Sequence, residues 1–314
     1  MMNKTIPLTM QGMRLDVALA ALFPEYSRSM LTAALKKGYI EVNQKLVKPK
    51  DKVKGNEEVT LDAGFFTVKE VENCQPENIP LAIVYEDADL LVVNKPANFV
   101  VHPGRGNLKH TLVNGLIYYK EGLANLPRAG IIHRLDQNTT GLLLVAKTHA
   151  AYNALIKAMK AREIKRHYYA LVQGVVLRPN ICQTFYGRSL QNRLKMAVKR
   201  SGKEAITLYK PYKNFAHFTL VDIELMTGRT HQIRVHMQYL KHPIVGDPLY
   251  GQAYHLPSEA NLALVTALNN FTRQALHAYK LVFAHPINKK EVNLSIDLPS
   301  DMQLLLNKVE QYDI

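Results

Sequence analysis

The segment 131–147 places three side chains that could do chemistry, His133, Arg134 and Asp136, between two apolar runs. Both runs predict buried strands, so the polar residues lie at a turn that joins them. A buried carboxylate is costly unless a cation or hydrogen bonds compensate, so Asp136 needs a partner. Two interpretations stay open here: a reactive carboxylate, or a structural turn whose aspartate is neutralised by Arg134. His133 and Asp136 alone are too few ligands for a metal site, so we expect none.

Two further segments carry candidate reactive side chains. Tyr168 and Tyr169 are neighbours in a predicted strand and point to opposite faces, so either one faces a cleft while the other packs, or both are strand residues at the edge of the core. The pattern of segment 227–237 predicts a helix that begins after Gly228, with His231 and Arg234 on one face. A cationic helix face beside an apolar one is also typical of an ordinary surface helix.

The composition favours a polyanionic partner. The chain has 314 residues with 40 Lys and Arg against 26 Asp and Glu, a net charge of +14. This charge points first to nucleic acid and second to an anionic membrane surface. No stretch approaches the roughly 20 apolar residues that span a bilayer. The two cysteines suit a reducing compartment, so we expect a cytoplasmic protein without a membrane partner.

The length of the chain predicts two domains. A polar, proline-containing stretch at 73–80 predicts a linker between a small unit, 1–75, and a large domain, 81–314. Strands outnumber helices in the large domain and do not alternate strictly with them, which favours an α+β fold with a large mixed sheet. The expected strands are 39–43 and 58–61 in the small unit, after two short helices, and 81–86, 90–94, 167–172, 218–225, 276–283 and 291–296 in the large domain. The expected helices of the large domain are 149–163, 229–240 and 260–273.

The small unit resembles a known RNA-binding domain. Arg14-Leu15-Asp16, Ser27-Arg28-Ser29 and Lys37-Gly38-x-Ile40-x-Val42-Asn43 together resemble the S4 domain over about residues 13–62. S4 domains lay a helix and its adjoining loop on RNA phosphates. The resemblance implies this role for Arg14, Arg28, Lys36, Lys37 and Lys45. Taken one at a time, each of these basic residues could equally be an ordinary surface charge in contact with water.

The large domain resembles an enzyme family. His133-Arg134-Leu135-Asp136-x-x-Thr139-Thr140-Gly141 resembles the central motif of the RluA-type pseudouridine synthases. Further ordered matches extend the resemblance over residues 81–300: Arg166-x-Tyr168-x-Ala170, Gly228-Arg229-x-His231-Gln232-x-Arg234 and Gly246-Asp247-x-x-Tyr250-Gly251. The resemblance implies a mainly antiparallel mixed sheet and an isomerase that converts uridine in RNA to pseudouridine without a cofactor.

The same resemblance implies residue roles. The family's nucleophile corresponds to Asp136, the arginine that pairs with it to Arg234, and the tyrosine that stacks on the target base to Tyr168. Contacts to RNA are expected from His133, Arg134, Arg229 and His231. The basic run 188–203, with six Lys and Arg and no acid, is expected to grip the RNA backbone.

The leader 126–130 is most similar to family members that act on large-subunit ribosomal RNA. We therefore expect a monomer that acts on 23S ribosomal RNA or on a large-subunit assembly intermediate. A synthase for transfer RNA or for another ribosomal site, and a non-catalytic RNA-binding assembly factor, remain alternatives. The sequence departs from the family pattern where Asn98 replaces a usual glycine and Gln137 a common lysine. Asn98 tolerates a positive φ, so the turn is expected to survive, whereas Gln137 removes one charge near the RNA.

Overall fold

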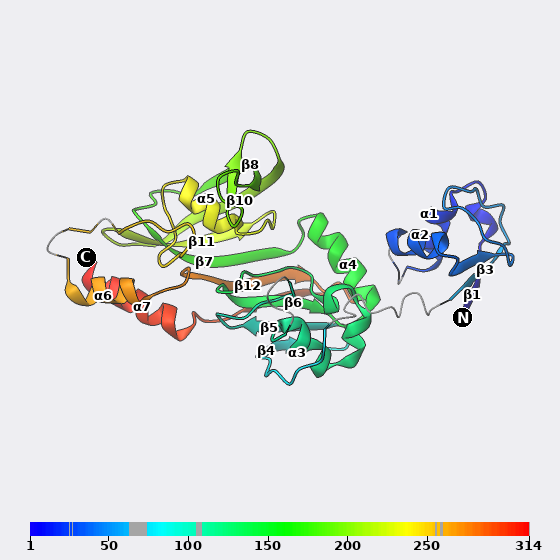
Figure 1. The fold of residues 1–314 in the computed structure, drawn as a ribbon, viewed down its shortest axis with the longest axis horizontal. Helices are drawn as coiled ribbons and strands as arrows, with labels where there is room; N and C mark the ends of the chain where they lie inside the picture. Colours follow the sequence, from blue (N-terminus) through cyan, green and yellow to red (C-terminus); the bar gives the residue numbers. More distant parts are fainter. Residues whose placement is uncertain are drawn as a thin grey trace.

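The computed structural model describes residues 1–24, 26, 28–62, 74–104, 109–254, 256–257 and 260–313. Within these ranges the strands form two sheets (Figure 1). A three-stranded sheet belongs to the N-terminal unit, and a ten-stranded sheet forms the centre of the large domain.

The N-terminal unit packs two helices on its small sheet, which has the strand order β1-β3-β2 and is antiparallel. Its core contains Leu19 and Leu31 from the helices, Phe23 directly after α1 and Ile40 from the sheet, all fully buried. Both helices and two of the strands were predicted, whereas β1 was not. The elements are β1 (Met2–Thr5), α1 (Leu15–Leu22), α2 (Arg28–Lys36), β2 (Ile40–Val42) and β3 (Glu58–Leu61).

The large sheet is mixed and mainly antiparallel, which confirms the predicted fold class. Its order is β4-β5-β6-β12-β7-β11-β10-β8-β9, with β13 also paired to β12. Among the pairs of the described strands, only β6 with β12 is parallel. The strands are β4 (Ile83–Glu86), β5 (Leu90–Lys95), β6 (Thr140–Ala146), β7 (Lys165–Gln173), β8 (Asn180–Arg188), β9 (Met196–Lys199), β10 (Lys203–Asn214), β11 (Phe218–Leu225), β12 (Leu276–Ala284) and β13 (Glu291–Ser295).

Helices cover parts of this sheet. The helix α4 begins after Thr148, whose hydroxyl caps the backbone N–H of Ala151, and it packs Leu155 against residues of β5 and β6. None of the helices in the described ranges has both the length and the apolarity needed to cross a membrane. The helices are α3 (Leu112–Tyr119), α4 (His149–Lys160), α5 (Gln232–Tyr239), α6 (Leu262–Asn270) and α7 (Ser300–Tyr312), of which α6 and α7 lie near the C-terminus (Figure 1).

Two local predictions around the motifs are wrong. The apolar run before Asp136 is not a strand, because Ile131 forms a single bridge to Val145 and the preceding Arg128 and Ala129 have positive φ angles of 55° and 53°. The helix α5 begins at Gln232 rather than at residue 229, because His231 adopts a left-handed conformation with φ 58°.

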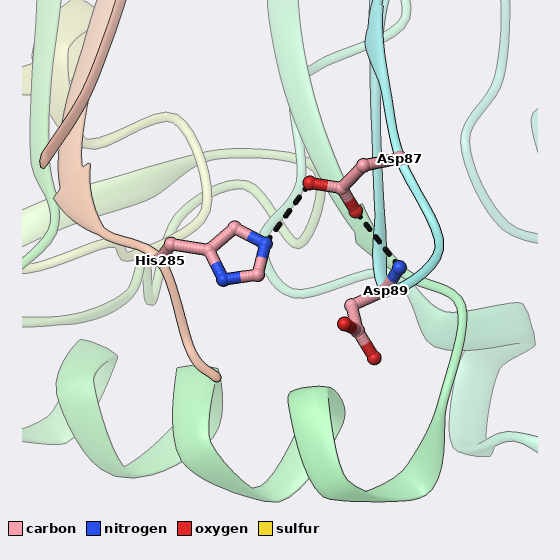
Figure 2. A group of neighbouring side chains, drawn as sticks. All are labelled: Asp87, Asp89 and His285. Carbon is pink, nitrogen blue, oxygen red and sulfur yellow. Dashed lines mark hydrogen bonds and ion pairs between the residues drawn. The ribbon is translucent and has the colours of Figure 1, made fainter. Parts of the chain in front are cut away.

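A hydrogen-bonded trio joins the β4–β5 turn to the end of β12 (Figure 2). Asp87 accepts hydrogen bonds from the backbone N–H groups of Asp89 and Leu90, both at 2.8 Å, and from Nε2 of His285 at 2.9 Å. The other ring nitrogen of His285 accepts from the N–H of Ile287 at 3.2 Å. Within the described ranges, Asp87, Asp89 and His285 are the one group of three potential metal ligands close enough to share an ion. Because these hydrogen bonds occupy both ring nitrogens, we interpret the trio as structural.

Candidate active site

The loop that carries Asp136 is clamped by a buried lysine. The ammonium group of Lys95, at the end of β5, donates to the carbonyl oxygens of Gln137, Pro96 and Phe99 at 2.8, 2.6 and 3.0 Å. Lys95 is only 1% exposed, and its three carbonyl partners satisfy its three donors. The turn after β5 and the loop beside Asp136 are therefore held together.

A glycine lets the next strand pair closely behind this loop. Gly141, in β6, has φ 114°, and a Cβ atom there would lie 2.3 Å from the carbonyl oxygen of Ala278 in β12. No side chain fits at this distance, so glycine is required for the parallel pairing of β6 with β12.

Arg234 is the cation that Asp136 requires. Its Nη1 donates to Oδ2 of Asp136 at 3.1 Å, while its Nε and Nη2 donate to Asp247 at 2.7 and 2.8 Å. Burial alone would lower the pKa of Arg234, but Asp247 and Asp136 outweigh it and raise the pKa, so the guanidinium stays charged. The sequence predicted the pair of Arg234 with Asp136. It did not predict the role of Asp247, although Asp247 lies in a motif that matches the family.

The second carboxylate oxygen of Asp136 faces a histidine. Nε2 of His231 lies 4.0 Å from Oδ1 of Asp136. Burial lowers the pKa of His231, although the Asp136 carboxylate opposes this shift, so the imidazole is neutral at pH 7. His231 has a left-handed conformation at the start of α5, and both His231 and Arg234 lie close to Asp136.

Tyr168 and Tyr169 face opposite sides of β7, as the strand alternation predicts. Tyr168 is 3% exposed and lines the same cavity as Asp136. Burial raises the pKa of the Tyr168 phenol, which is therefore neutral. Tyr169 instead stacks on Tyr279, with ring centroids 3.9 Å apart and an interplanar angle of 10°.

The cavity beside Asp136 has a volume of about 460 Å³ and is strongly cationic. Asp136 is the single acid among the described residues that line it, and the pKa values of His102 and His133 are lowered to about 4 and about 3, chiefly by burial. A cavity of this charge attracts a polyanion. Its basic lining residues are Arg128, Arg134, Lys160, Arg162, Arg166 and Arg229.

The predicted RNA-binding residues of the large domain lie at this cavity or beside it. Arg134 is exposed, and the exposed Arg229 donates from Nε to the carbonyl of Glu204 at 3.1 Å. The ring of His133 points inward, because its Nε2 accepts a hydrogen bond from the backbone N–H of Leu144 at 3.2 Å. His133 therefore fixes the loop to β6 as well as lining the cavity.

In the N-terminal unit, one acid holds two of the predicted RNA-binding residues. Arg14 and Arg28 both contact Asp16, at 2.9 and 2.8 Å. The hydrogen bond from Arg14 lowers the pKa of Asp16 to about 2, with a further contribution from Arg28 and against the opposing effect of burial. Three other predicted residues, which we call the lysine group, are exposed: Lys36, Lys37 and Lys45.

Comparison with known proteins places this geometry in a family. A family model described as RNA pseudouridylate synthase matches residues 89–239, and a model described as S4 domain matches residues 13–59. Among solved structures, human RNA pseudouridylate synthase domain containing 4 has the same fold, with a TM-score of 0.57, 23% identity and coverage of 73% of this chain and 93% of that one. Human RNA pseudouridylate synthase domain containing 1 gives a TM-score of 0.55 at 25% identity, over 76% of this chain and 98% of that one.

Curated relatives match over the full length. The chain is 42% identical over 306 residues to ribosomal large subunit pseudouridine synthase D of Xanthomonas campestris pv. campestris, covering 98% of this chain and 92% of the relative. It therefore belongs to the RNA pseudouridine synthase family and isomerises uridine in RNA to pseudouridine. The protein of the same name from Vibrio parahaemolyticus is 42% identical over 318 residues, covering 100% of this chain and 97% of the relative. That from Escherichia coli O157:H7 is 43% identical, covering 97% and 93%.

Proposed function

We propose that this protein converts uridine to pseudouridine in large-subunit (23S) ribosomal RNA, with Asp136 as the nucleophile. The observation that carries the catalytic assignment is the contact of 3.1 Å between Arg234 and Asp136 at a cationic cavity that Tyr168 also lines. The relatives named for the large ribosomal subunit support the substrate. The proposed setting is the cytoplasm, and the proposed active form is a monomer acting on 23S RNA or on a large-subunit assembly intermediate.

The reaction exchanges one glycosidic bond for another. The bond from C1′ of the ribose to N1 of uracil breaks, the base turns, and a bond from C1′ to C5 forms. C5 loses a proton and N1 gains one, so the product is an isomer of the substrate. No bond is hydrolysed and no electron is transferred, so the proposed step calls for no redox cofactor.

Asp136 begins the reaction in this proposal, either by attack on the sugar or as the base that starts detachment of uracil. Arg234 keeps one carboxylate oxygen in a fixed direction, and Asp247 in turn fixes Arg234. Since Arg234 and Asp247 are buried, this orientation is set before the RNA arrives.

Tyr168 would stack on the detached uracil, and its neutral phenol is suited to relaying the proton that C5 loses. The uridine has to leave its stack to enter the cavity, at a cost of a few kcal/mol. Arg134, exposed next to the nucleophile, is placed to fill the vacated space or to hold the phosphate of the flipped nucleotide. The basic run 188–203 and the lysine group would bind the phosphates of the RNA backbone outside the cavity.

The test is a map of pseudouridines in all cellular RNA from cells with and without this protein. We expect the loss of one or a few sites confined to large-subunit ribosomal RNA, and their return when the wild-type chain is restored. A loss confined to transfer RNA would contradict the proposed substrate, and no loss in any RNA would contradict the proposed activity.

A further inference from the structure

A tyrosine outside the three predicted catalytic residues joins several parts of the site. The hydroxyl of Tyr250 lies 3.0 Å from Nδ1 of His231 and accepts a hydrogen bond from the backbone N–H of Met196 at 2.8 Å. Its ring also lies beneath the guanidinium of Arg234, with 5.1 Å from the guanidinium carbon to the ring centroid. Tyr250 is 1% exposed, so none of these contacts competes with bulk water.

These hydrogen bonds fix the tautomer of His231. Burial raises the pKa of Tyr250, so its hydroxyl keeps its proton. No acceptor for that proton other than Nδ1 of His231 occurs among the described residues. A buried hydroxyl proton without an acceptor is unfavourable, so Tyr250 donates to Nδ1. The proton of the neutral imidazole is then on Nε2, which is the atom that faces Oδ1 of Asp136 at 4.0 Å.

The same tyrosine is attached to the basic run 188–203. Met196, whose N–H it accepts, opens β9, and the ammonium group of Lys195 lies over the Tyr250 ring at 5.8 Å from its centroid. β9 thus packs on the tyrosine that orients both His231 and Arg234. If RNA binding shifts β9, the side chain of Tyr250 would transmit that shift to the residues that contact Asp136.

We propose that Tyr250 is a positioning residue that holds His231 as a neutral donor toward Asp136 and couples this arrangement to RNA bound at β9. The inference rests on the proposed function, because it assumes that Asp136 reacts. At 4.0 Å the Nε2–H group of His231 forms no hydrogen bond with Oδ1 of Asp136, but its positive end faces that oxygen without adding a second cation. A protonated His231 would stabilise the carboxylate that the reaction has to consume, and would slow the reaction.

The test uses the full chain and a large-subunit ribosomal RNA transcript that carries tritium at C5 of its uridines. Because C5 loses its hydrogen in the reaction, tritium release measures turnover. For Tyr250→Phe, which retains the ring, we expect a single-turnover rate about tenfold lower at pH 7 and an RNA dissociation constant within about twofold of wild type. The rate should fall further as the pH drops from 7 to 5.5, because Nδ1 of His231 becomes free to take a proton.

A second variant identifies the titrating group. Besides the neutral hydroxyl of Tyr250, the groups that face His231 are the charged side chains of Asp136, Arg134, Arg234 and Asp247. In the double variant His231→Gln/Tyr250→Phe, the glutamine amide replaces the Nε2 donor and cannot titrate. We therefore expect the extra loss of rate at low pH to disappear, and its persistence would contradict the assignment to His231.

Tyr254→Phe is the matched control. Tyr254 is partly buried, and its hydroxyl likewise accepts from a backbone N–H, that of Gly246, and donates to the carbonyl of Leu268, both at 3.3 Å, so its removal tests loss of stability alone. We expect a wild-type pH profile for this control. If Tyr250→Phe has a wild-type rate and pH profile, or loses only RNA affinity, the proposal is wrong. Failure of the wild-type enzyme to release tritium would instead contradict the proposed function.

Discussion

Replacing Asp247 with asparagine tests how far the position of Asp136 depends on the residue that holds Arg234. In the wild type the carboxylate of Asp247 accepts from Nε and Nη2 of Arg234 and from the backbone N–H groups of Leu249 and Tyr250. An amide has one oxygen to accept with. If that oxygen keeps the contacts of Oδ1, the amide nitrogen faces Nε of Arg234, donor against donor.

The expected size of this effect follows from the burial of the pair. The Asp247 side chain is 0% exposed and that of Arg234 5%. Removing one member of a buried, hydrogen-bonded ion pair costs about 3–5 kcal/mol, and the remaining contact of Arg234 with Asp136 favours the lower end. A misplacement of Arg234 by about 1 Å should lower the turnover rate by roughly 100-fold.

The assay combines urea unfolding of the large domain with tritium release from C5-labelled RNA. Asp301→Asn is the matched control, since Asp301 receives the same two-point contact from Arg273, at 2.6 and 2.8 Å, but its side chain is 48% exposed. We expect the control to lose about 1 kcal/mol or less. Equal losses of stability for the two variants, or wild-type turnover by Asp247→Asn, would refute the argument.

Three further predictions concern the proposed RNA-binding residues and the loop that carries Asp136. The folded-state pKa of Asp16 is lowered from 3.8 to about 2. The carboxylate therefore stabilises the N-terminal unit fully at pH values above 3.8, and this stabilisation is lost as the pH falls through 2. Asp16→Asn should therefore lower the melting temperature of that unit at pH 7, with the difference from wild type narrowing between pH 4 and 2 in thermal unfolding; a difference independent of pH would contradict this. The amide of Gln137 donates to the side-chain oxygen of Asn98 at 2.9 Å. A double-mutant cycle of Asn98→Gly and Gln137→Ala should therefore give a coupling free energy of about 0.5–1 kcal/mol in urea unfolding. Additive effects of the two substitutions would show that this hydrogen bond does not contribute to stability. Changing all three residues of the lysine group to glutamine should flatten the slope of log affinity against log salt by about 2 if each contacts one phosphate, and an unchanged slope would show that they do not bind RNA.

The two departures from the family pattern illustrate what the sequence could predict. Asn98 was expected to adopt a positive φ, and it does, at 54°. Its hydrogen bond with Gln137 was not predicted, because the two residues are 39 positions apart and only the fold brings them together. The two residues that depart from the pattern therefore contact each other.

Elements with strong apolar patterns were predicted well. The strand β11 (Phe218–Leu225) has the predicted bounds, because seven of its eight residues are buried and the run is correspondingly apolar. The strands β8, β9 and β10 were not predicted. Many of their residues are exposed, and polar residues such as Gln183 and Lys210 interrupt the apolar pattern.

The sequence proposed residues for the candidate site but not the contacts that support them. The family resemblance singled out Asp136, Tyr168 and Arg234, which all lie around one cavity region. The clamp from Lys95 and the positions of Asp247 and Tyr250 depend on tertiary contacts. The start of α5 was also missed, because a left-handed histidine has no composition signal of the kind that glycine gives.

The most direct test of the account is the turnover of Asp136→Asn on C5-tritiated large-subunit ribosomal RNA. The substitution is nearly isosteric, so the RNA dissociation constant should stay within about twofold of wild type. The amide is neither a nucleophile nor a base, so we predict no tritium release above background in a single turnover. Release at a rate near that of the wild type would contradict the assignment of Asp136 as the nucleophile.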